Sequence, residues 1–263
     1  FAALVAGVSF VSSGEMVDPS AFEMKIEYVV SGYSGSTTIT DLPVLVRLRG
    51  EEPSGFSYAR CPQDSIRFAD SEGNLLAHEV DTWNSSGEST IWVKIPQVSG
   101  KTTEFTMYFG GAGAKPAALD AKSVWSNYAA VFHGGAQSYA NAVGNAIVGS
   151  VGSDKVTVQT APCKVGGGIN KSSCNYKPFN FTNPVKAGVL ASVKNMTLSG
   201  WFCPDKYKND SDTLGTGILA CSRSAWDDAN NKNGFALMCE AGTWLSLSIG
   251  AGHNPISKPA TQE

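Results

Sequence analysis

Charge is sparse in this 263-residue chain, in which Asp, Glu, Lys and Arg make up 16% of the residues. A typical soluble protein has about 25%. No segment concentrates Lys or Arg, and the formal net charge is −3 at pH 7. Binding to nucleic acid or to an anionic membrane surface would ordinarily require a basic patch. The sequence therefore predicts no nucleic-acid partner.

A long hydrophobic run is also missing, since a membrane-spanning helix needs about 20 consecutive apolar residues. The apolar N-terminal stretch over residues 1–13 is too short for that purpose. It reads like the apolar region and cleavage zone of a secretory signal. Ala3 to Val11 equally suit a β-strand, placed either in the chain's own module or at the sheet edge of a neighbouring molecule. All three interpretations of residues 1–20 stay open, and the chain is predicted not to span a membrane.

Cysteine is scarce in the first 160 residues, where Cys61 stands alone. No two cysteines form a Cys-x-x-Cys pair, which argues against a zinc ribbon or a thioredoxin-type site. The late cysteines are candidates for disulfides formed in an oxidising compartment, with buried free thiols as the alternative. These candidates are Cys163, Cys174, Cys203, Cys221 and Cys239. The sequence does not choose their pairing, and Cys61 would be either free or paired across modules.

The first hundred residues alternate apolar and polar side chains with a period of two, which is typical of half-buried β-strands. Turn-forming Ser, Gly and Asn residues separate the apolar segments, and no helical periodicity competes with them. The predicted strands lie at residues 22–30, 42–48, 66–68, 91–95 and 105–109. The sequence therefore predicts a first β-sandwich module over residues 21–112.

A second module is predicted after a glycine-rich linker at residues 113–123, within which Ala117 to Lys122 suit one helical turn. Residues 124–263 make up this module. Its predicted strands lie at residues 196–202, 217–220, 234–238 and 244–249. The polar C-terminal end shows no closing strand, so we expect the module to be incomplete. The predicted fold class is all-β, with two β-sandwich modules in tandem.

Several blocks of the first module occur in the order and spacing of a known bacterial family. Leu42–Leu48 is followed by Asp64–Gly73, His78–Asn84 and Ile91–Pro96. Over residues 22–112 these blocks resemble the uncharacterised domain of unknown function 2341. The resemblance implies an exported bacterial protein, in which a laminin-G-like, concanavalin-type jelly roll often follows this domain.

The continuation of the chain resembles such a second domain. Val124–Tyr128 and Val131–His133 resemble its beginning, and Met196–Phe202 resembles its central strand. The resemblance implies that residues 124–263 form a concanavalin/laminin-G-like jelly roll. Asn141–Asn145 replaces the usual Asp-Ser-x-Gly-Asn pattern, so the calcium site of the family does not carry over.

Glu79 and Asp81 lie two residues apart on a predicted strand, so both project from the same face. Glycosidases of the concanavalin-type fold place their nucleophile and acid on Glu-x-Asp-x-x-Glu, but the third position here is Asn84. We therefore interpret the pair as structural carboxylates bonded to turn amides or to Arg67, and we predict no enzymatic activity. The dispersed histidines are also interpreted as structural. They are His78, His133 and His253.

Aromatic rings and acidic loops supply the remaining candidate sites. Sugars stack their C–H faces on aromatic rings, and a polar loop after Ser222 combines such a ring with carboxylates and amides. The candidate ligand-binding residues are Trp226, Asp227, Asp228, Asn230, Trp244 and Trp83. Trp92 and Trp201 fall within predicted strands and are assigned to core packing. Asp64, Asp70 and Glu72 are candidate calcium ligands, with an Asp-capped β-turn as the alternative.

These features together predict a secreted or bacterial cell-surface protein that binds a polysaccharide or glycan through its lectin-like module. Two alternatives stay open. The chain would be a subunit of a surface filament or coat that assembles with itself or another surface protein through the N-terminal strand. It would otherwise be an accessory part of a polysaccharide-degrading enzyme. Calcium is the one cofactor that the sequence suggests.

Overall fold

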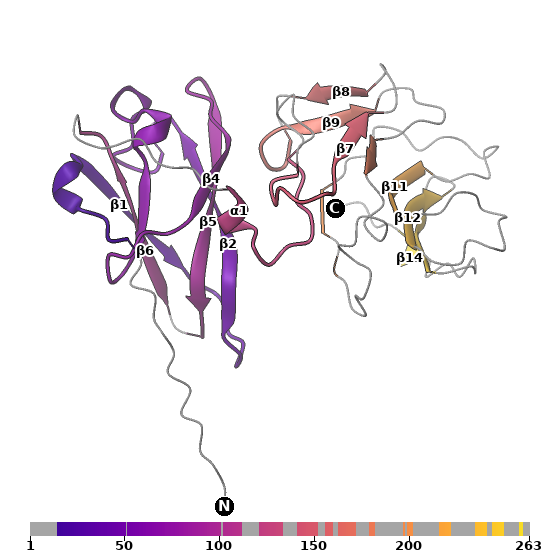
Figure 1. The fold of residues 1–263 in the computed structure, drawn as a ribbon, viewed down its shortest axis with the longest axis horizontal. Helices are drawn as coiled ribbons and strands as arrows, with labels where there is room; N and C mark the ends of the chain where they lie inside the picture. The colour runs from indigo at the N-terminus through magenta and orange to yellow at the C-terminus, as the bar shows by residue number, and fades with distance from the viewer. Residues whose placement is uncertain are drawn as a thin grey trace, which may run out of the picture. The chain divides into compact units, whose positions relative to one another are not determined.

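The computed structural model divides the chain into two units, one up to Thr182 and one from Asn183 onward, and strands dominate both (Figure 1). The structure describes residues 15–50, 52–100, 102–111, 121–133, 141–151, 156–159, 163–171, 179–181, 197, 199–201, 216–221, 235–240, 244–249 and 258–259. The all-β fold class is confirmed. In this described part of the chain, no helix is long and apolar enough to cross a membrane.

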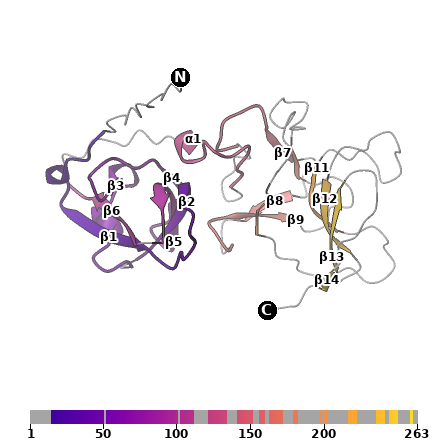
Figure 2. The same ribbon diagram turned by 90° about the horizontal axis from the view of Figure 1, so that it is seen from below.

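Two three-stranded antiparallel sheets build the first sandwich, and Figure 2 shows them as two layers. One sheet has the order β1-β6-β3 and the other has the order β2-β5-β4. The strands are β1 (Met24–Val30), β2 (Ile39–Arg49), β3 (Arg67–Asp70), β4 (His78–Thr82), β5 (Glu88–Val98) and β6 (Thr103–Phe109). Five of them overlap the strands predicted from the period-two alternation, and β4 is the strand on which Glu79 and Asp81 were placed. Three short 3-10 helices accompany them: η1 (Pro19–Ala21), η2 (Tyr58–Arg60) and η3 (Gln63–Ser65).

The hydrophobic core lies between these two sheets and draws apolar side chains from both. Its fully buried members include Phe68, Phe109, Leu48, Ile66, Ile91, Ile95, Met107, Val93 and Val98. Burying one large apolar side chain contributes roughly 1.5–3 kcal/mol. Because the inward positions of each strand supply this core, the outward positions are left to carry polar side chains.

The residues that follow the apolar N-terminal stretch pair with the first sandwich. Leu75 N–H donates to the Glu15 carbonyl at 2.7 Å, and Val17 N–H donates to the Gly73 carbonyl at 3.0 Å. Val17 is buried. The last part of the predicted segment 1–20 therefore belongs to the chain's own sandwich, whereas the strand predicted from Ala3 to Val11 lies outside the described residues.

A short helix, α1 (Ala121–Val124), opens a segment that covers the second sheet, as its position beside β5 in Figure 1 illustrates. We call residues 121–133 the cap. Val124 and Trp125 are buried. The sequence places this segment across the end of the linker 113–123 and the start of the module 124–263, whereas the structure attaches it to the first sandwich.

The rest of the first unit contains two small antiparallel ladders. One joins β7 (Gly149–Val151) to β10 (Phe179–Phe181). The other joins β8 (Val156–Gln159) to β9 (Gly168–Lys171). Neither ladder is among the strands predicted for residues 124–263, although both fit the predicted all-β class.

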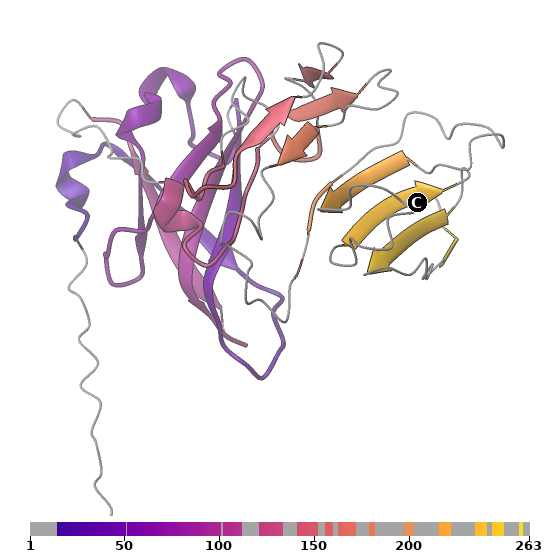
Figure 3. The ribbon, with the colours of Figure 1, turned by 45° about the vertical axis from the view of Figure 1, so that its right-hand side comes forward.

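The second unit contains a four-stranded antiparallel sheet of order β11-β12-β13-β14, drawn in orange to yellow in Figure 3. Its strands are β11 (Thr216–Cys221), β12 (Phe235–Glu240), β13 (Trp244–Ile249) and β14 (Lys258–Pro259). The first three were predicted, and the two-residue β14 was missed. The strand predicted at 196–202 is wrong for its described residues, which are not in a strand. The assignment of Trp201 to a core is also wrong, because its side chain is exposed.

Candidate functional site

The outer face of the β2-β5-β4 sheet carries a cluster of titratable side chains beneath the cap. Glu79 and Asp81 project from β4 toward this face, as their spacing predicts. The ladder between β4 and β5 shifts register between Val80 and Thr82, so Asp81 occupies an irregular position. Trp92 stands opposite Glu79 on β5. The cap brings Trp125 and His133 onto these side chains.

Glu79 is the residue on which the cap converges. Its Oε2 accepts a hydrogen bond from the Trp125 indole N–H and lies 3.0 Å from His133 Nε2. The Glu79 side chain is 14% exposed and that of His133 is 19% exposed. One carboxylate therefore joins two cap residues that follow it in sequence by 46 and 54 positions.

Asp81 is enclosed more completely, since its side chain is 4% exposed. Its Oδ1 lies 3.8 Å from His133 Nδ1, and its Oδ2 accepts a hydrogen bond of 3.3 Å from the Thr90 hydroxyl. The backbone of Gly166 covers it as well, because a β-carbon at that position would lie 2.6 Å from Oδ2. Glycine is the one residue that permits this approach without displacing the carboxylate.

Burial raises the pKa of Asp81, and the negative charge of Glu79 adds to that effect. His133, Thr90 and Trp92 act in the opposite direction without reversing it. The Trp92 indole N–H is close enough to favour the charged carboxylate, although its geometry is not that of a hydrogen bond. For His133, burial disfavours the imidazolium. The hydrogen bond and charge of Glu79, with the charge of Asp81, outweigh that and raise the pKa of His133.

A second set of polar contacts fastens the beginning of the cap. Lys94 Nζ on β5 donates to the Ser123 carbonyl at 3.1 Å and to the Ser126 hydroxyl at 2.8 Å. The same ammonium lies 3.3 Å from Asp41 Oδ1, and Asn127 Nδ2 donates to Asp41 Oδ2 at 3.1 Å. The cap is thus attached at two places on the sheet, one through Lys94 and one through Glu79.

Aromatic rings fill the space between these attachments. The Trp125 ring meets Trp92 edge to face at 5.3 Å and Tyr128 edge to face at 5.1 Å. It also lies 5.7 Å from the His133 ring. Aromatic pairs in this arrangement contribute about 0.5–1.5 kcal/mol beyond the area they bury. The titratable cluster is therefore held inside a packed aromatic layer and not in an open cleft.

The arrangement of the three titratable groups suits an ion pair better than a metal site. One imidazole nitrogen faces each carboxylate, so one ring nitrogen and the two carboxylates do not converge on a common point. Among the described residues no group of three His, Cys, Asp or Glu side chains is arranged to hold a metal ion. The chemistry available to the cluster is proton binding by His133 between two carboxylates.

The partners predicted for the acidic pair are wrong. Glu79 and Asp81 bond to Trp125, His133 and Thr90, not to turn amides or Arg67. Two of those partners lie 46 and 54 residues away, beyond the reach of a local pattern. The one signal available was the composition of the cap, where three aromatic residues and a histidine follow a four-residue helix.

The predicted ligand-binding residues lie mostly outside the described part of the chain. Trp226, Asp227, Asp228 and Asn230 are outside it, and so is the side chain of Trp244 at the start of β13. Trp83 is partly buried, packs against the first core and meets Tyr58 edge to face at 5.3 Å. Its ring therefore serves the packing of the sandwich.

Two of the candidate calcium ligands, Asp70 and Glu72, lie in a capped turn in the structure. Asp70 Oδ1 accepts hydrogen bonds of 2.9 Å from the backbone N–H groups of Glu72 and Asn74, and Oδ2 accepts one from Asn74 Nδ2. Gly73 supplies the positive φ of this turn, at 88°. Asp64 lies in η3. This geometry is that of the Asp-capped β-turn considered as the alternative, and calcium binding stays a prediction.

Two cysteines of the described part, Cys61 and Cys163, are free thiols there. In the second unit Cys221 pairs with Phe235 across the ladder, and Cys239 lies four residues further along β12. Four residues of a strand span about 13 Å, which exceeds the Cα separation that a disulfide permits. If Cys221 and Cys239 form disulfides, they therefore do so with other partners.

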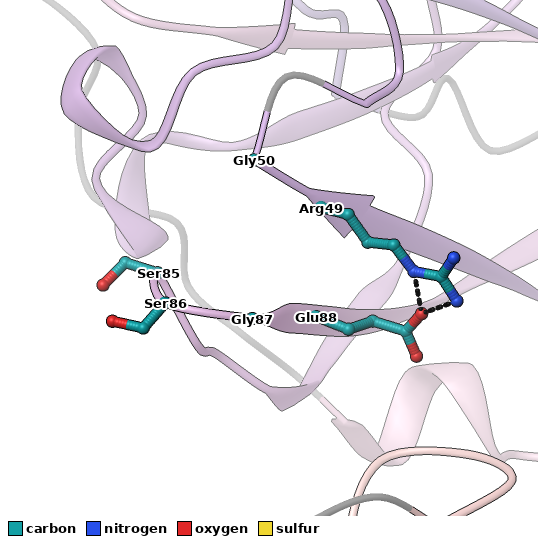
Figure 4. A pocket seen from close by; sticks show the side chains of 6 residues that line it. All are labelled: Arg49, Gly50, Ser85, Ser86, Gly87 and Glu88. Carbon is teal, nitrogen blue, oxygen red and sulfur yellow. Dashed lines mark hydrogen bonds and ion pairs between the residues drawn. The ribbon is translucent and has the colours of Figure 1, made fainter.

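A depression near the end of the β2-β5 ladder is lined by Arg49, Gly50, Ser85, Ser86, Gly87 and Glu88 (Figure 4). Arg49 Nε donates to Glu88 Oε2 at 2.6 Å, and Arg47 also donates to this carboxylate. In Figure 4 the two serine side chains point away from the ion pair. The arginine groups are engaged with Glu88, so the depression is an ordinary strand end with a charge pair.

Residues 63–140 match a family described as Domain of unknown function (DUF2341). The match begins at η3, so it leaves out Leu42–Leu48, the first of the blocks from which the resemblance was predicted. It continues to residue 140, beyond the predicted end of the resemblance at residue 112. It therefore includes Glu79, Asp81 and the whole cap. No curated protein and no solved structure matches the chain.

Proposed function

We propose that this chain is a secreted or bacterial cell-surface protein that binds a polysaccharide or glycan and has no enzymatic activity of its own. In this proposal the binding part is the portion of the chain that follows the cap, folded as a concanavalin/laminin-G-like jelly roll. The strand content of the described residues supports it, because jelly rolls and related sandwiches include lectin domains. The fold alone does not assign a ligand, so the proposal depends on a specific side chain.

The observation that carries the proposal is the exposure of Trp201, whose residue surface is 74% accessible to solvent. Ser199 and Gly200 beside it are exposed as well. An exposed indole offers a flat apolar face on which the C–H groups of a sugar ring stack. Nearby hydroxyl and backbone groups then supply the few oriented hydrogen bonds that a binding site needs.

The test begins with a glycan array probed with the full chain, followed by titration calorimetry of the strongest ligand. We expect Trp201→Ala to raise Kd about tenfold, because losing about 1.4 kcal/mol of stacking and contact corresponds to that factor. Val29→Ala truncates an exposed apolar side chain of the first unit and is the matched control, with a wild-type Kd. An unchanged Kd in Trp201→Ala would reject this residue as the site. An array without any ligand would reject glycan binding itself.

The proposed lack of enzymatic activity is supported by the engagement of the acidic pair. A carboxylate that attacks or protonates a substrate must reach it, whereas Glu79 and Asp81 are nearly enclosed beneath the cap. Incubating the full chain with the bound polysaccharide should release no reducing sugar above background. Release that Glu79→Gln abolishes would overturn this part of the proposal.

A further inference from the structure

We propose that Glu79, Asp81 and His133 form a pH-sensitive clasp, which holds the cap on the β2-β5-β4 sheet in acid and loosens as the medium becomes alkaline. The three side chains come from two segments that are 52 to 54 residues apart, β4 and the end of the cap. Joining them closes the cap over the outer face of the sheet. The proposal is independent of which ligand the second half binds.

The geometry favours the charged imidazole. His133 Nε2 lies 3.0 Å from Glu79 Oε2, and Nδ1 lies 3.8 Å from Asp81 Oδ1. The imidazolium carries a proton on both nitrogens and meets each carboxylate with an N–H group. Either neutral tautomer has a lone pair on one nitrogen and turns it toward a carboxylate oxygen. Deprotonation therefore replaces one attraction by a repulsion, whichever tautomer forms.

The arginine on the outer face of this sheet does not replace that positive charge, because Arg47 of β2 pairs with Glu88 and donates to the Lys164 carbonyl. Glu79 and Asp81 on β4 are the charged groups that face His133, and Thr90, Trp92 and Gly166 from the other packed segments are neutral. Trp125 contributes a neutral indole from the cap itself. The cation on β5 that reaches the cap, Lys94, is held by Asp41 and by groups at the other attachment. Loss of the His133 proton thus leaves two enclosed carboxylates without a partner charge, which is strongly unfavourable.

The direction of the pH effect follows from proton binding. The pKa of His133 in the closed state lies above the ordinary value of about 6.5, so the closed cap holds this proton more tightly than the open cap. The stabilisation is complete below about pH 6.5 and is lost as the pH rises through the closed-state pKa. The pKa of Asp81 is also raised in the closed state, so the stability that its protonated form gives to the closed cap is likewise lost as the pH rises. Between about pH 6.5 and the closed-state pKa of His133, opening the cap releases one proton. The equilibrium constant for opening the cap therefore rises up to tenfold per pH unit.

Hydrogen exchange on the full chain measures this opening. The amide of Tyr128 bonds to the Trp125 carbonyl, so its exchange reports the cap. Amides of β6 in the opposite sheet report global unfolding. After correction for the intrinsic pH dependence of exchange, we expect protection of the cap to fall up to tenfold per pH unit above about pH 6.5. Protection of β6 should change much less.

Two variants and a control decide the origin of the effect. His133→Gln keeps a hydrogen-bonding side chain without the charge, and it should give an exchange rate in the cap that is high and independent of pH. Glu79→Gln keeps an acceptor for the Trp125 indole, and it should move the transition to lower pH. Glu27→Gln removes an exposed carboxylate that pairs with Lys25 on β1, and it should behave as the wild type.

The position of the His133 titration in the wild type provides an independent measurement, read by NMR from its ring protons. A midpoint above 6.5 that coincides with loss of cap protection supports the clasp. A midpoint at or below 6.5, or cap protection that stays constant from pH 6 to 9, overturns it. If His133→Gln also loses protection of β6, the variant is destabilised globally and does not report on the cap alone. The wild-type titration and the Glu79→Gln variant then decide whether the clasp is supported or overturned.

Discussion

Replacing Gly166 by alanine tests how closely the loop at residues 163–168 approaches the acidic cluster. The new methyl carbon would lie 2.6 Å from Asp81 Oδ2 and 2.9 Å from Thr82 Oγ1, nearer than carbon and oxygen approach without a bond. Gly166 also has a φ of +52°, a conformation that L-residues disfavour. The substitution therefore combines backbone strain with a steric overlap.

The two effects can be separated, because Gly50 has nearly the same conformation in open surroundings. Its φ is +49°, and nothing lies within 4 Å of the position of its missing β-carbon. A left-handed conformation costs an L-residue about 1–2 kcal/mol. Overpacking adds about 1–3 kcal/mol. We therefore expect Gly50→Ala to lose about 1–2 kcal/mol of unfolding free energy and Gly166→Ala about 2–5 kcal/mol.

Native-state hydrogen exchange of the β4 and β5 amides gives the free energy of opening for both variants under the same conditions. In the Asp81→Ala background, Gly166→Ala should reduce the free energy of opening by at least about 1 kcal/mol less than it does in the wild type. Residues in direct contact show coupling energies of about this size in double-mutant cycles. Gly50→Ala should reduce the free energy of opening by the same amount with or without Asp81→Ala. Equal losses in the two glycine variants, or no coupling to Asp81, would show that residues 163–168 do not rest on this carboxylate.

Two further predictions concern the buried groups of the first core. Burial lowers the pKa of His78 to about 4, so its folded form stays neutral while the unfolded chain binds a proton below about pH 6.5. The unfolding free energy should accordingly fall by roughly 3 kcal/mol between pH 7 and pH 4, and denaturant titrations should find this fall absent in His78→Phe. Burial raises the pKa of the Cys61 thiol to about 12, so a thiol reagent at pH 8 should modify Cys163 in the native chain and reach Cys61 only after unfolding.

The strands of the first sandwich could be predicted because each has one face in a core. Val44, Val46 and Leu48 of β2 alternate with side chains that point outward, and half-burial produces that period in the sequence. The common face of Glu79 and Asp81 follows from the same rule. These features are local, so a few consecutive residues contain all the information they require.

The contacts that make the site are not local, and this is why the sequence misassigned them. Arg67 was the nearest arginine along the chain to the acidic pair, but its guanidinium donates to the carbonyls of Asp64 and Ile66. The actual partners become neighbours only when the cap folds back across β4. No periodicity marks that return, because the cap makes one four-residue helix and then continues without regular structure.

Trp201 shows the limit of alternation as a criterion for a strand. Met196 and Leu198 alternate with polar residues ahead of the tryptophan, and this run led to the prediction of an embedded strand with a packed ring. Ser199 and Gly200 adjoin it, however, and glycine weakens a strand because it offers no side chain to pack. The described residues at this position are outside any strand, and the indole is exposed.

The cap offers a physical reason why the family match continues beyond residue 112. A sandwich that ended at residue 112 would leave Trp92, Glu79 and Asp81 on an uncovered sheet face, with a large indole beside two carboxylates. Trp125 covers that indole edge to face and donates to Glu79, and His133 lies between the two carboxylates. The match reaches residue 140 and so takes in both. Residues 121–133 therefore cover the outer face of the β2-β5-β4 sheet and also lead on to the rest of the chain.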